Sequence, residues 1–260
     1  MLKDDVKEKA LAGAGGTQTK RKCSMDQNEI DEAAGETLRI FRESGAIVED
    51  VHVVHISGLH FPMTINKDAI FPHLDRIERL ARLLARRLTD LSIDIVCGPA
   101  MGGLVVGEWL AHELGVMCAF AEHDPDPQPG EIRGRFVLRR GYDQLVSNRN
   151  VLVVDDIVNT GHSIRQTIEA VRAAGGQVVA AVSLVFVGNF DAKALGVDDY
   201  YYLLHYDVPP GWPPEECPLC RDGVPVNTRY GHGKEFLAAQ KKKQEGKGDT
   251  TPSVEGGTGS

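Results

Sequence analysis

The sequence contains no apolar run long enough to cross a membrane as a helix, and its first residues lack the apolar core of a signal peptide. Basic residues are outnumbered: 37 aspartates and glutamates against 29 lysines and arginines give a net charge of −8. That balance argues against broad nucleic-acid or anionic-membrane binding. Cysteine is scarce, and five residues, an odd number, favour a reducing compartment over a disulfide framework. We therefore expect a cytoplasmic protein with no nucleic-acid or membrane partner.

The length and composition of the chain are typical of a globular protein. With 260 residues, 42% of them hydrophobic, the protein can bury a full core. Residues 1–26 and 237–260 are polar and small without sustained periodicity, which is typical of disordered tails. We therefore expect a single folded domain over residues 27–236.

Residues 151–163 carry the most informative pattern. Residues 151–154 are four apolar side chains, as in a strand buried on both faces, and Asp155 and Asp156 follow at its end. A turn with Thr160, Gly161 and Ser163 leads into a helical pattern that two glycines end at 175–176, before another apolar strand. This strand–helix–strand unit places acids and hydroxyls at the edge where open parallel sheets bind ligands.

The same order of elements occurs earlier in the chain. A strand at 93–97 runs into the glycine-rich turn 98–103, followed by a helix and a strand at 116–121. Two such units predict an α/β fold with a mostly parallel sheet. The other expected elements are a helix at 29–43, a strand or hairpin arm at 46–56, an extended polar loop at 60–68, a helix at 71–88 and a final strand at 199–206.

The acid pair and its turn suit a ligand that carries both hydroxyls and a phosphate. Carboxylates accept hydrogen bonds from sugar hydroxyls, while turn amides and the helix N-terminus hold a phosphate. The structural alternative is a helix-capping acid beside a solvated acid. Residues 122–131 contain three prolines and predict a long exposed lid, which is followed by Arg133, Arg135, Arg139 and Arg140.

At this point a family resemblance can be stated. Residues 151–163 resemble the phosphoribosyl-pyrophosphate signature of type I phosphoribosyltransferases, and other segments resemble the orotate phosphoribosyltransferases in particular. Those segments are the pyrophosphate loop at 98–103, an N-terminal substrate segment at 57–60, the loop flanks at 120–122 and 138–141, and a C-terminal signature at 217–225 found in a bacterial branch.

The resemblance implies a type I phosphoribosyltransferase fold, in which helices flank a central, mostly parallel sheet and an N-terminal hood segment and a flexible loop are added. It also implies a homodimer in which one subunit's loop completes the other's site. The reaction would transfer ribose 5-phosphate from phosphoribosyl pyrophosphate to a nucleobase, with orotate as the first candidate, and release pyrophosphate. Mg²⁺ would be the cofactor, held by the substrate rather than by protein ligands.

Carried over by motif, the resemblance assigns catalysis to Asp155, Asp156, Arg133, Arg135 and Arg140. It assigns substrate binding to Ile157, Val158, Asn159, Thr160, Gly161, His162 and Ser163 of the turn, to Pro99, Ala100, Met101, Gly102 and Gly103 of the pyrophosphate loop, and to His60, Asn66, Lys67 and His123. A plain surface histidine is the alternative for His123.

The Cys217-x-x-Cys220 spacing is half of a zinc knuckle. The chain has no second cysteine pair, so further ligands would come from His205, His232 or another subunit. The alternative is a packed tail turn with two free thiols.

Three further functional hypotheses stay open. The first keeps the reaction and changes the base to a purine or another heterocycle. The second is a non-catalytic sensor of phosphoribosyl pyrophosphate or a nucleotide, because residues 124–130 contain no lysine for the leaving pyrophosphate. The third is a signalling receiver domain, whose required acid and lysine partners are missing from the later strand ends.

Overall fold

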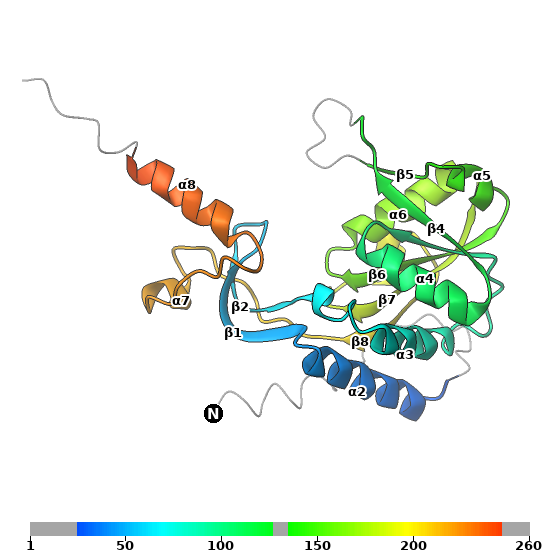
Figure 1. Ribbon diagram of the computed structural model, residues 1–260, viewed down its shortest axis with the longest axis horizontal. Helices are drawn as coiled ribbons and strands as arrows, with labels where there is room; N and C mark the ends of the chain where they lie inside the picture. Colours follow the sequence, from blue (N-terminus) through cyan, green and yellow to red (C-terminus); the bar gives the residue numbers. More distant parts are fainter. Residues whose placement is uncertain (1–24, 127–134, 246–260) are drawn as a thin grey trace, which may run out of the picture. The chain divides into compact units, whose positions relative to one another are not determined.

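The computed structural model describes residues 25–126 and 135–245 (Figure 1). Most of the tail expected at 1–26 and the end of the tail expected at 237–260 lie outside these residues. The chain divides into two compact units. The larger combines Met1–Ala46 with Lys67–Val208, and the smaller combines Ile47–Asn66 with Pro209–Ser260. Each unit is described below by itself.

The larger unit is built on a six-stranded sheet with the order β5-β4-β3-β6-β7-β8. Its strands are β3 (Ile95–Pro99), β4 (Met117–His123), β5 (Phe136–Val137), β6 (Asn150–Val158), β7 (Gln177–Phe186) and β8 (Tyr200–His205). All neighbouring strands are parallel except β4 and β5, which are antiparallel. The predicted α/β architecture is therefore confirmed.

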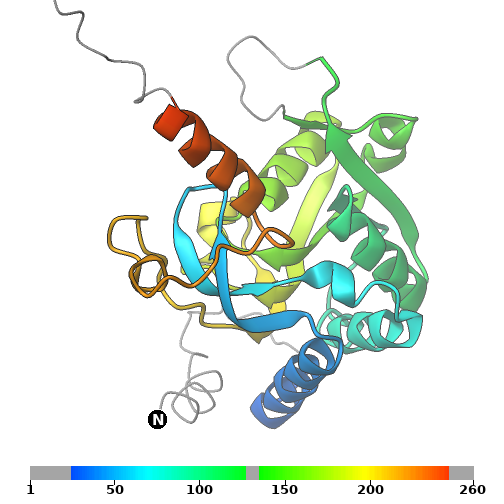
Figure 2. The same ribbon diagram turned by 60° about the vertical axis from the view of Figure 1, so that its left-hand side comes forward.

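Helices cover both faces of this sheet (Figures 1 and 2). On one face α4 (Gly102–Leu114) packs on β3, β4 and β6, with α2 (Gln27–Glu43) and α3 (Leu74–Ala85) beside it. On the other face α6 (His162–Ala173) packs on β3, β6 and β7. The short segments η1 (Lys67–Ala69), α5 (Tyr142–Val146) and η2 (Ala192–Leu195) complete the unit. A capping box starts α2, in which Asp26 Oδ1 accepts from the Glu29 amide at 2.9 Å and Glu29 Oε2 from the Asp26 amide at 3.0 Å.

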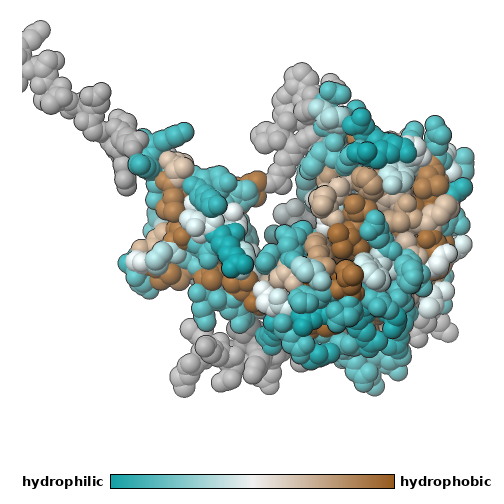
Figure 3. Space-filling model, in the orientation of Figure 1, coloured by the Kyte–Doolittle hydropathy of each residue, from teal (hydrophilic) through white to brown (hydrophobic). Residues whose placement is uncertain are grey.

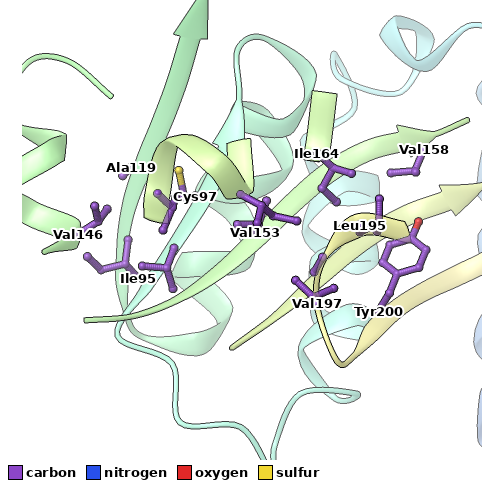
Figure 4. Packing of buried hydrophobic residues seen from close by; sticks show 14 of the residues in the cluster. Ile95, Cys97, Ala119, Val146, Val153, Val158, Ile164, Leu195, Val197 and Tyr200 are labelled. Carbon is purple, nitrogen blue, oxygen red and sulfur yellow. The ribbon is translucent and has the colours of Figure 1, made fainter. Parts of the chain in front are cut away.

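One hydrophobic cluster joins α6 to the sheet (Figure 4). Val151 and Val153 of β6 pack with Ile164, Ile168 and Val171 of α6, the last three at the spacing predicted for one helix face. All five side chains are fully buried. The cluster fixes the end of β6 against the start of α6, which is where the candidate site lies.

The smaller unit is a hairpin with two C-terminal helices. Strands β1 (Ile47–Val54) and β2 (His60–Ile65) pair antiparallel from Ile47↔Ile65 to Val54↔His60, and α7 (Pro218–Arg221) and α8 (Gly233–Glu245) follow. Our expectation of a loop at 60–68 was wrong for residues 60–65, because pairing with β1 supplies the backbone partners that the local sequence does not predict. Helix α8 also extends past residue 236, since alanine, glutamine and lysine favour helix.

None of the helices within residues 25–126 and 135–245 has the length and apolar character needed to span a membrane.

Candidate active site at the switch point of the sheet

The site lies where two neighbouring strands send the chain in opposite directions. From β3 the chain passes through α4 on one face, and from β6 it passes through α6 on the other face. Because β3 and β6 are adjacent and parallel, their carboxyl ends open a crevice between the two following loops. The pairing of β3 with β6 ends at Cys97↔Val153, so the rest of β6 extends beyond it toward this crevice.

Asp155 and Asp156 belong to that extension. We expected both acids to follow the strand, but β6 continues to Val158 because Asp155 and Ile157 still pair with Ser183 and Val185 of β7. The acids are only 7% and 6% exposed. Asp155 Oδ1 accepts from the Asp156 amide at 2.9 Å, and Asp156 Oδ1 accepts from the Ile157 amide at 2.5 Å. These local hydrogen bonds hold each carboxylate against its own backbone.

Lys67 provides the counter-ion of the pair. Its Nζ lies 3.3 Å from Asp156 Oδ2 and 3.0 Å from Asp68 Oδ1. Burial lowers the pKa of Lys67, but the two carboxylates outweigh it and the net pKa is raised. The ammonium is therefore held in its charged form at the end of β6.

Burial dominates the titration of both aspartates. It raises the pKa of Asp155 well above its ordinary value, and the neighbouring Asp156 raises it further. It also raises the pKa of Asp156, where Lys67 opposes the shift by favouring the charged carboxylate. Carboxyl groups with strongly perturbed pKa values at a sheet edge mark a candidate functional site.

The glycine-rich loop after β3 packs directly on this acid pair. A Cβ on Gly102 would lie 1.6 Å from Asp156 Oδ2 and 3.1 Å from Lys67 Nζ, and a Cβ on Gly103 would lie 2.9 Å from the Val154 carbonyl oxygen. Gly102 is therefore required in the structure, because a side chain there would displace the Asp156 carboxylate. A side chain on Gly103 would instead collide with Pro99 Cδ, which lies 2.4 Å from the Cβ position, and with the Val154 carbonyl oxygen.

The turn after β6 exposes the groups predicted to bind phosphate. Asn159, Thr160 and His162 are exposed and Ser163 is half-buried, whereas Val158 packs in the hydrophobic cluster. Gly161 adopts a positive φ of 72°, and His162 begins α6, so the glycine stands where the turn requires it.

Both helices at the crevice begin without a side-chain cap. Met101 precedes α4 and Gly161 precedes α6, and neither supplies a capping hydrogen bond. The first backbone N–H groups of α4 therefore stay available for an anion, whereas the first amide of α6, that of His162, donates to Thr160 Oγ1 at 3.4 Å. Pro99 ends β3, and Ala100 and Met101 lead into α4, with Met101 72% exposed.

The antiparallel pair β4–β5 flanks the segment of the predicted lid, of which residues 127–131 lie outside the described residues. Its arginines form ion pairs at the base: Arg135 Nε lies 3.1 Å from Asp124 Oδ2, and Arg140 Nη2 lies 3.2 Å from Glu122 Oε2. The His123 ring stacks on Phe136 with centroids 4.4 Å apart. Arg133 lies outside the described residues.

The remaining expected residues belong to the smaller unit. Asn66 follows β2, and His60 is a buried residue at the start of that strand. His60 lies with Cys217 and Cys220 in a cluster that includes His52, a residue the sequence had not singled out. The two histidines that we had considered as partners of the cysteines are not part of this cluster. Sequence reasoning also missed Asp68, which is ion-paired with Lys67. Its place directly after Lys67 in the chain could have pointed to this pair.

Comparison with known proteins agrees with this geometry. The family model for the phosphoribosyl transferase domain matches residues 66–210, more than half of the chain. The protein therefore belongs to the phosphoribosyltransferases, a class of glycosyltransferase enzymes.

The relatives most informative about the branch of the family are named orotate phosphoribosyltransferases. An orotate phosphoribosyltransferase from Pelotomaculum thermopropionicum is 37% identical over 191 residues, covering 74% of this chain and 94% of the relative. Orotate phosphoribosyltransferase 2 from Mesorhizobium japonicum is 38% identical over 199 residues, with coverage of 74% and 94%. This chain is thus most similar to the orotate branch of the family, as its motifs predicted.

Solved structures confirm the fold. Mycobacterium tuberculosis orotate phosphoribosyltransferase superposes with a TM-score of 0.53 at 21% identity, over 66% of this chain and 96% of that one. An adenine phosphoribosyltransferase from Thermoanaerobacter pseudethanolicus also gives 0.53, at 18% identity, with coverage of 66% and 99%. The type I phosphoribosyltransferase fold is therefore shared by enzymes named for different bases.

Proposed function

We propose that this protein transfers ribose 5-phosphate from phosphoribosyl pyrophosphate to orotate, giving orotidine 5′-monophosphate and pyrophosphate. The observation that carries the proposal is the buried Asp155–Asp156 pair, which faces the glycine loop and Lys67 at the switch point of the sheet. The names of the curated relatives supply orotate as the acceptor.

In this proposal the turn at 159–163 holds the 5-phosphate of the donor. Exposed hydroxyl groups and the backbone amides at the start of α6 are suitable donors for its oxygens. Asp155 and Asp156 accept hydrogen bonds from the ribose hydroxyls. A hydroxyl donor also stabilises the charged form of a carboxylate, which opposes the effect of burial on the pKa.

Loss of pyrophosphate leaves positive charge on the anomeric carbon, as in glycoside cleavage. The bond to the pyrophosphate oxygen breaks while a nitrogen of the base forms the new bond to that carbon, and the proton lost from that nitrogen passes to the pyrophosphate or to water. Two carboxylates beside the ribose favour the developing charge electrostatically. In this proposal the leaving pyrophosphate is stabilised by Lys67, whose Nζ lies 3.3 Å from Asp156 Oδ2, and by the amides at the start of α4.

The residues present fit an Mg²⁺ that is held mainly by the substrate. Asp156 is already paired with Lys67, and both acids are hydrogen-bonded to their own backbone, so the protein offers no ready cage of oxygen ligands here. Such an ion would neutralise charge on the leaving pyrophosphate. The protein's part is to position the ribose and the phosphates.

The lid arginines would complete the site when the loop closes. Arg135 and Arg140 are ion-paired with acids at the base of the lid, so their guanidinium groups are held there until a more strongly charged partner displaces those acids. We propose that these two, together with Arg133 and His123, contact the pyrophosphate and exclude water.

We further propose a cytoplasmic homodimer. Apolar side chains gather over α4 on the face of the larger unit seen in Figure 3, and Met101 at its start is 72% exposed. Exposed apolar side chains on such a face are compatible with a protein partner. Sedimentation velocity of the purified protein tests its oligomeric state, and a monomer at micromolar concentration would refute the proposed homodimer.

A base panel is the decisive test of the proposed reaction. Purified protein is incubated with phosphoribosyl pyrophosphate, Mg²⁺ and either orotate, uracil, adenine, guanine or hypoxanthine, and pyrophosphate release is measured. We expect release with orotate alone, and loss of release in Asp155→Asn and Asp156→Asn. Release with a purine would reassign the base. Ligand-dependent thermal stabilisation without release would favour a non-catalytic sensor.

A further inference from the structure

Four potential metal ligands converge inside the smaller unit. His52 of β1 and His60 of β2 face Cys217, which precedes α7, and Cys220 of α7, and the ligand atoms all lie within 4.8 Å of one another. The first three side chains are buried and Cys220 is exposed. No other group of this kind is present in the described part of the chain.

We propose that these four residues bind a structural Zn²⁺ in a tetrahedral Cys₂His₂ site. Zinc–nitrogen and zinc–sulfur bonds of about 2.0–2.1 and 2.3 Å place tetrahedral ligand atoms roughly 3.4–3.8 Å apart. His52 Nε2 lies 3.6 Å from Cys217 Sγ and 3.7 Å from Cys220 Sγ, and Cys220 Sγ lies 3.3 Å from His60 Nδ1. The shortest edge, 2.7 Å between His52 Nε2 and His60 Nδ1, needs a shift of less than 1 Å to admit the ion.

The orientation of His52 agrees with ligation. Its Nδ1 lies 2.7 Å from the Val224 carbonyl oxygen, so Nδ1 carries the hydrogen and donates it. The other nitrogen, Nε2, then presents its lone pair to the cluster. Zinc-bound histidines are held in this way by a backbone carbonyl or a carboxylate.

The chemistry of the donor set selects zinc. Two sulfurs and two imidazole nitrogens in a tetrahedron suit Zn²⁺ and exclude Mg²⁺ and Ca²⁺, which take oxygen ligands. Two thiolates with one negative charge each also neutralise the two positive charges of the ion, so the site as a whole carries no net charge. The exposed Cys220 gives the ion a path of entry.

The small core of this unit gives the ion a structural role. Among its described residues, the buried apolar side chains are Val53, Val54, Met63 and Cys217. Cores of that size seldom hold a fold alone, and disulfides or metals commonly supplement them. The proposed site links the hairpin to a segment 165 residues later in the chain, counted from His52 to Cys217. His60 thereby acquires a structural role in place of the substrate contact implied by resemblance.

Metal content and cobalt spectroscopy of the full-length protein test the site. We expect about one zinc per chain after purification without added chelator. Cobalt(II) substitution should give intense tetrahedral d–d bands and thiolate-to-cobalt charge transfer, and X-ray absorption of the zinc form should fit two sulfurs and two nitrogens. A strong chelator should lower Tm, and stoichiometric zinc should restore it.

Variants with matched controls separate ligation from folding. Cys217→Ser, Cys220→Ser and His52→Gln should each lose zinc and the cobalt bands. His55→Gln is the control on the same strand–turn segment, since the His55 ring stacks on Phe61 with centroids 4.1 Å apart and lies outside the cluster. Cys118→Ser is the thiol control and should keep both zinc and the bands.

The wild-type measurements decide the proposal even if a variant fails to fold. Zinc below about 0.1 per chain, with no cobalt charge transfer after reconstitution, overturns it. A Cys217–Cys220 disulfide in protein purified without reductant, together with absence of metal, overturns it in favour of a redox pair. Loss of zinc only in the control variants also overturns it.

Discussion

Replacing Gly102 by alanine should lower catalytic activity strongly while leaving the protein folded. The added Cβ would lie 1.6 Å from Asp156 Oδ2 and 2.6 Å from its Cγ, where an ordinary contact is about 3.5 Å. The carboxylate must therefore move by roughly 2 Å or push α4 away from β6. Asp156 cannot move freely, because its Oδ1 accepts from the Ile157 amide at 2.5 Å and its Oδ2 lies 3.3 Å from Lys67.

The expected magnitude follows from that displacement. A 1 Å misplacement of a positioned group costs on the order of 10²-fold in rate, so kcat/KM should fall by about 10²-fold or more. Overpacking of about 1–3 kcal/mol should lower Tm by roughly 2–10 °C, which leaves the protein folded at room temperature. We would measure loss of orotate with saturating phosphoribosyl pyrophosphate, and follow Tm by scanning calorimetry.

Gly107→Ala is the matched control on the same helix. Its Cβ would lie 3.3 Å from Val154 Cγ1 and 3.7 Å from Cys118 Sγ, which are near-ordinary contacts with side chains. This variant should keep activity within about threefold, since alanine also favours a helix interior. If Gly102→Ala matched the control in kcat/KM, the inferred contact between the glycine loop and Asp156 would be refuted.

Three further predictions concern the same sheet. Burial and Asp156 raise the pKa of Asp155, so its contribution to stability is complete below the ordinary aspartate pKa and is lost as pH rises through the folded-state pKa. Asp155→Asn should therefore raise Tm more at pH 8 than at pH 4, and an equal difference at both would contradict the assignment. Lys67→Gln removes the charge that opposes the raised pKa of Asp156, so the acid limb of the kcat/KM profile should move to higher pH, and an unchanged profile would argue against the ion pair. Ser183 Oγ lies 2.7 Å from the Tyr200 hydroxyl and 3.2 Å from the Val185 carbonyl oxygen. Ser183→Ala leaves the buried Tyr200 hydroxyl without its partner, so it should lower the free energy of unfolding in urea by about 1–3 kcal/mol, more than Tyr200→Phe does. The reverse order would exclude this hydrogen-bond network.

Local patterns were enough wherever neighbouring residues decide the structure. The apolar run of β6, the helical spacing of Ile164, Ile168 and Val171, and the glycines after α6 predicted a strand–helix–strand unit that the structure contains. The same reasoning put the acids and the turn at one sheet edge. Each of these features depends on side chains within a few residues of one another, or on which face of an element is apolar.

Pairings across the chain were missed for the opposite reason. Strand β2 has a weak local signal and exists through its partner β1, so residues 60–65 were expected to form a loop. The length of β6 was underestimated, because β7 continues to pair with it beyond Val154. Helix α8 was not predicted, and its residues from 237 onward were expected to belong to a disordered tail, although alanine, glutamine and lysine are compatible with helix.

The sequence by itself therefore determined the class of fold and the family, since the apolar strands, the tandem acid pair and the glycine-rich turn are patterns of residues close together in the chain. Only the tertiary structure decided that Lys67 neutralises Asp156, that Gly102 is glycine because a carboxylate occupies the space of its side chain, and that two histidines join two distant cysteines. Those contacts depend on the register of strands and the packing of helices. Register and packing are set by the whole core, which no local pattern records.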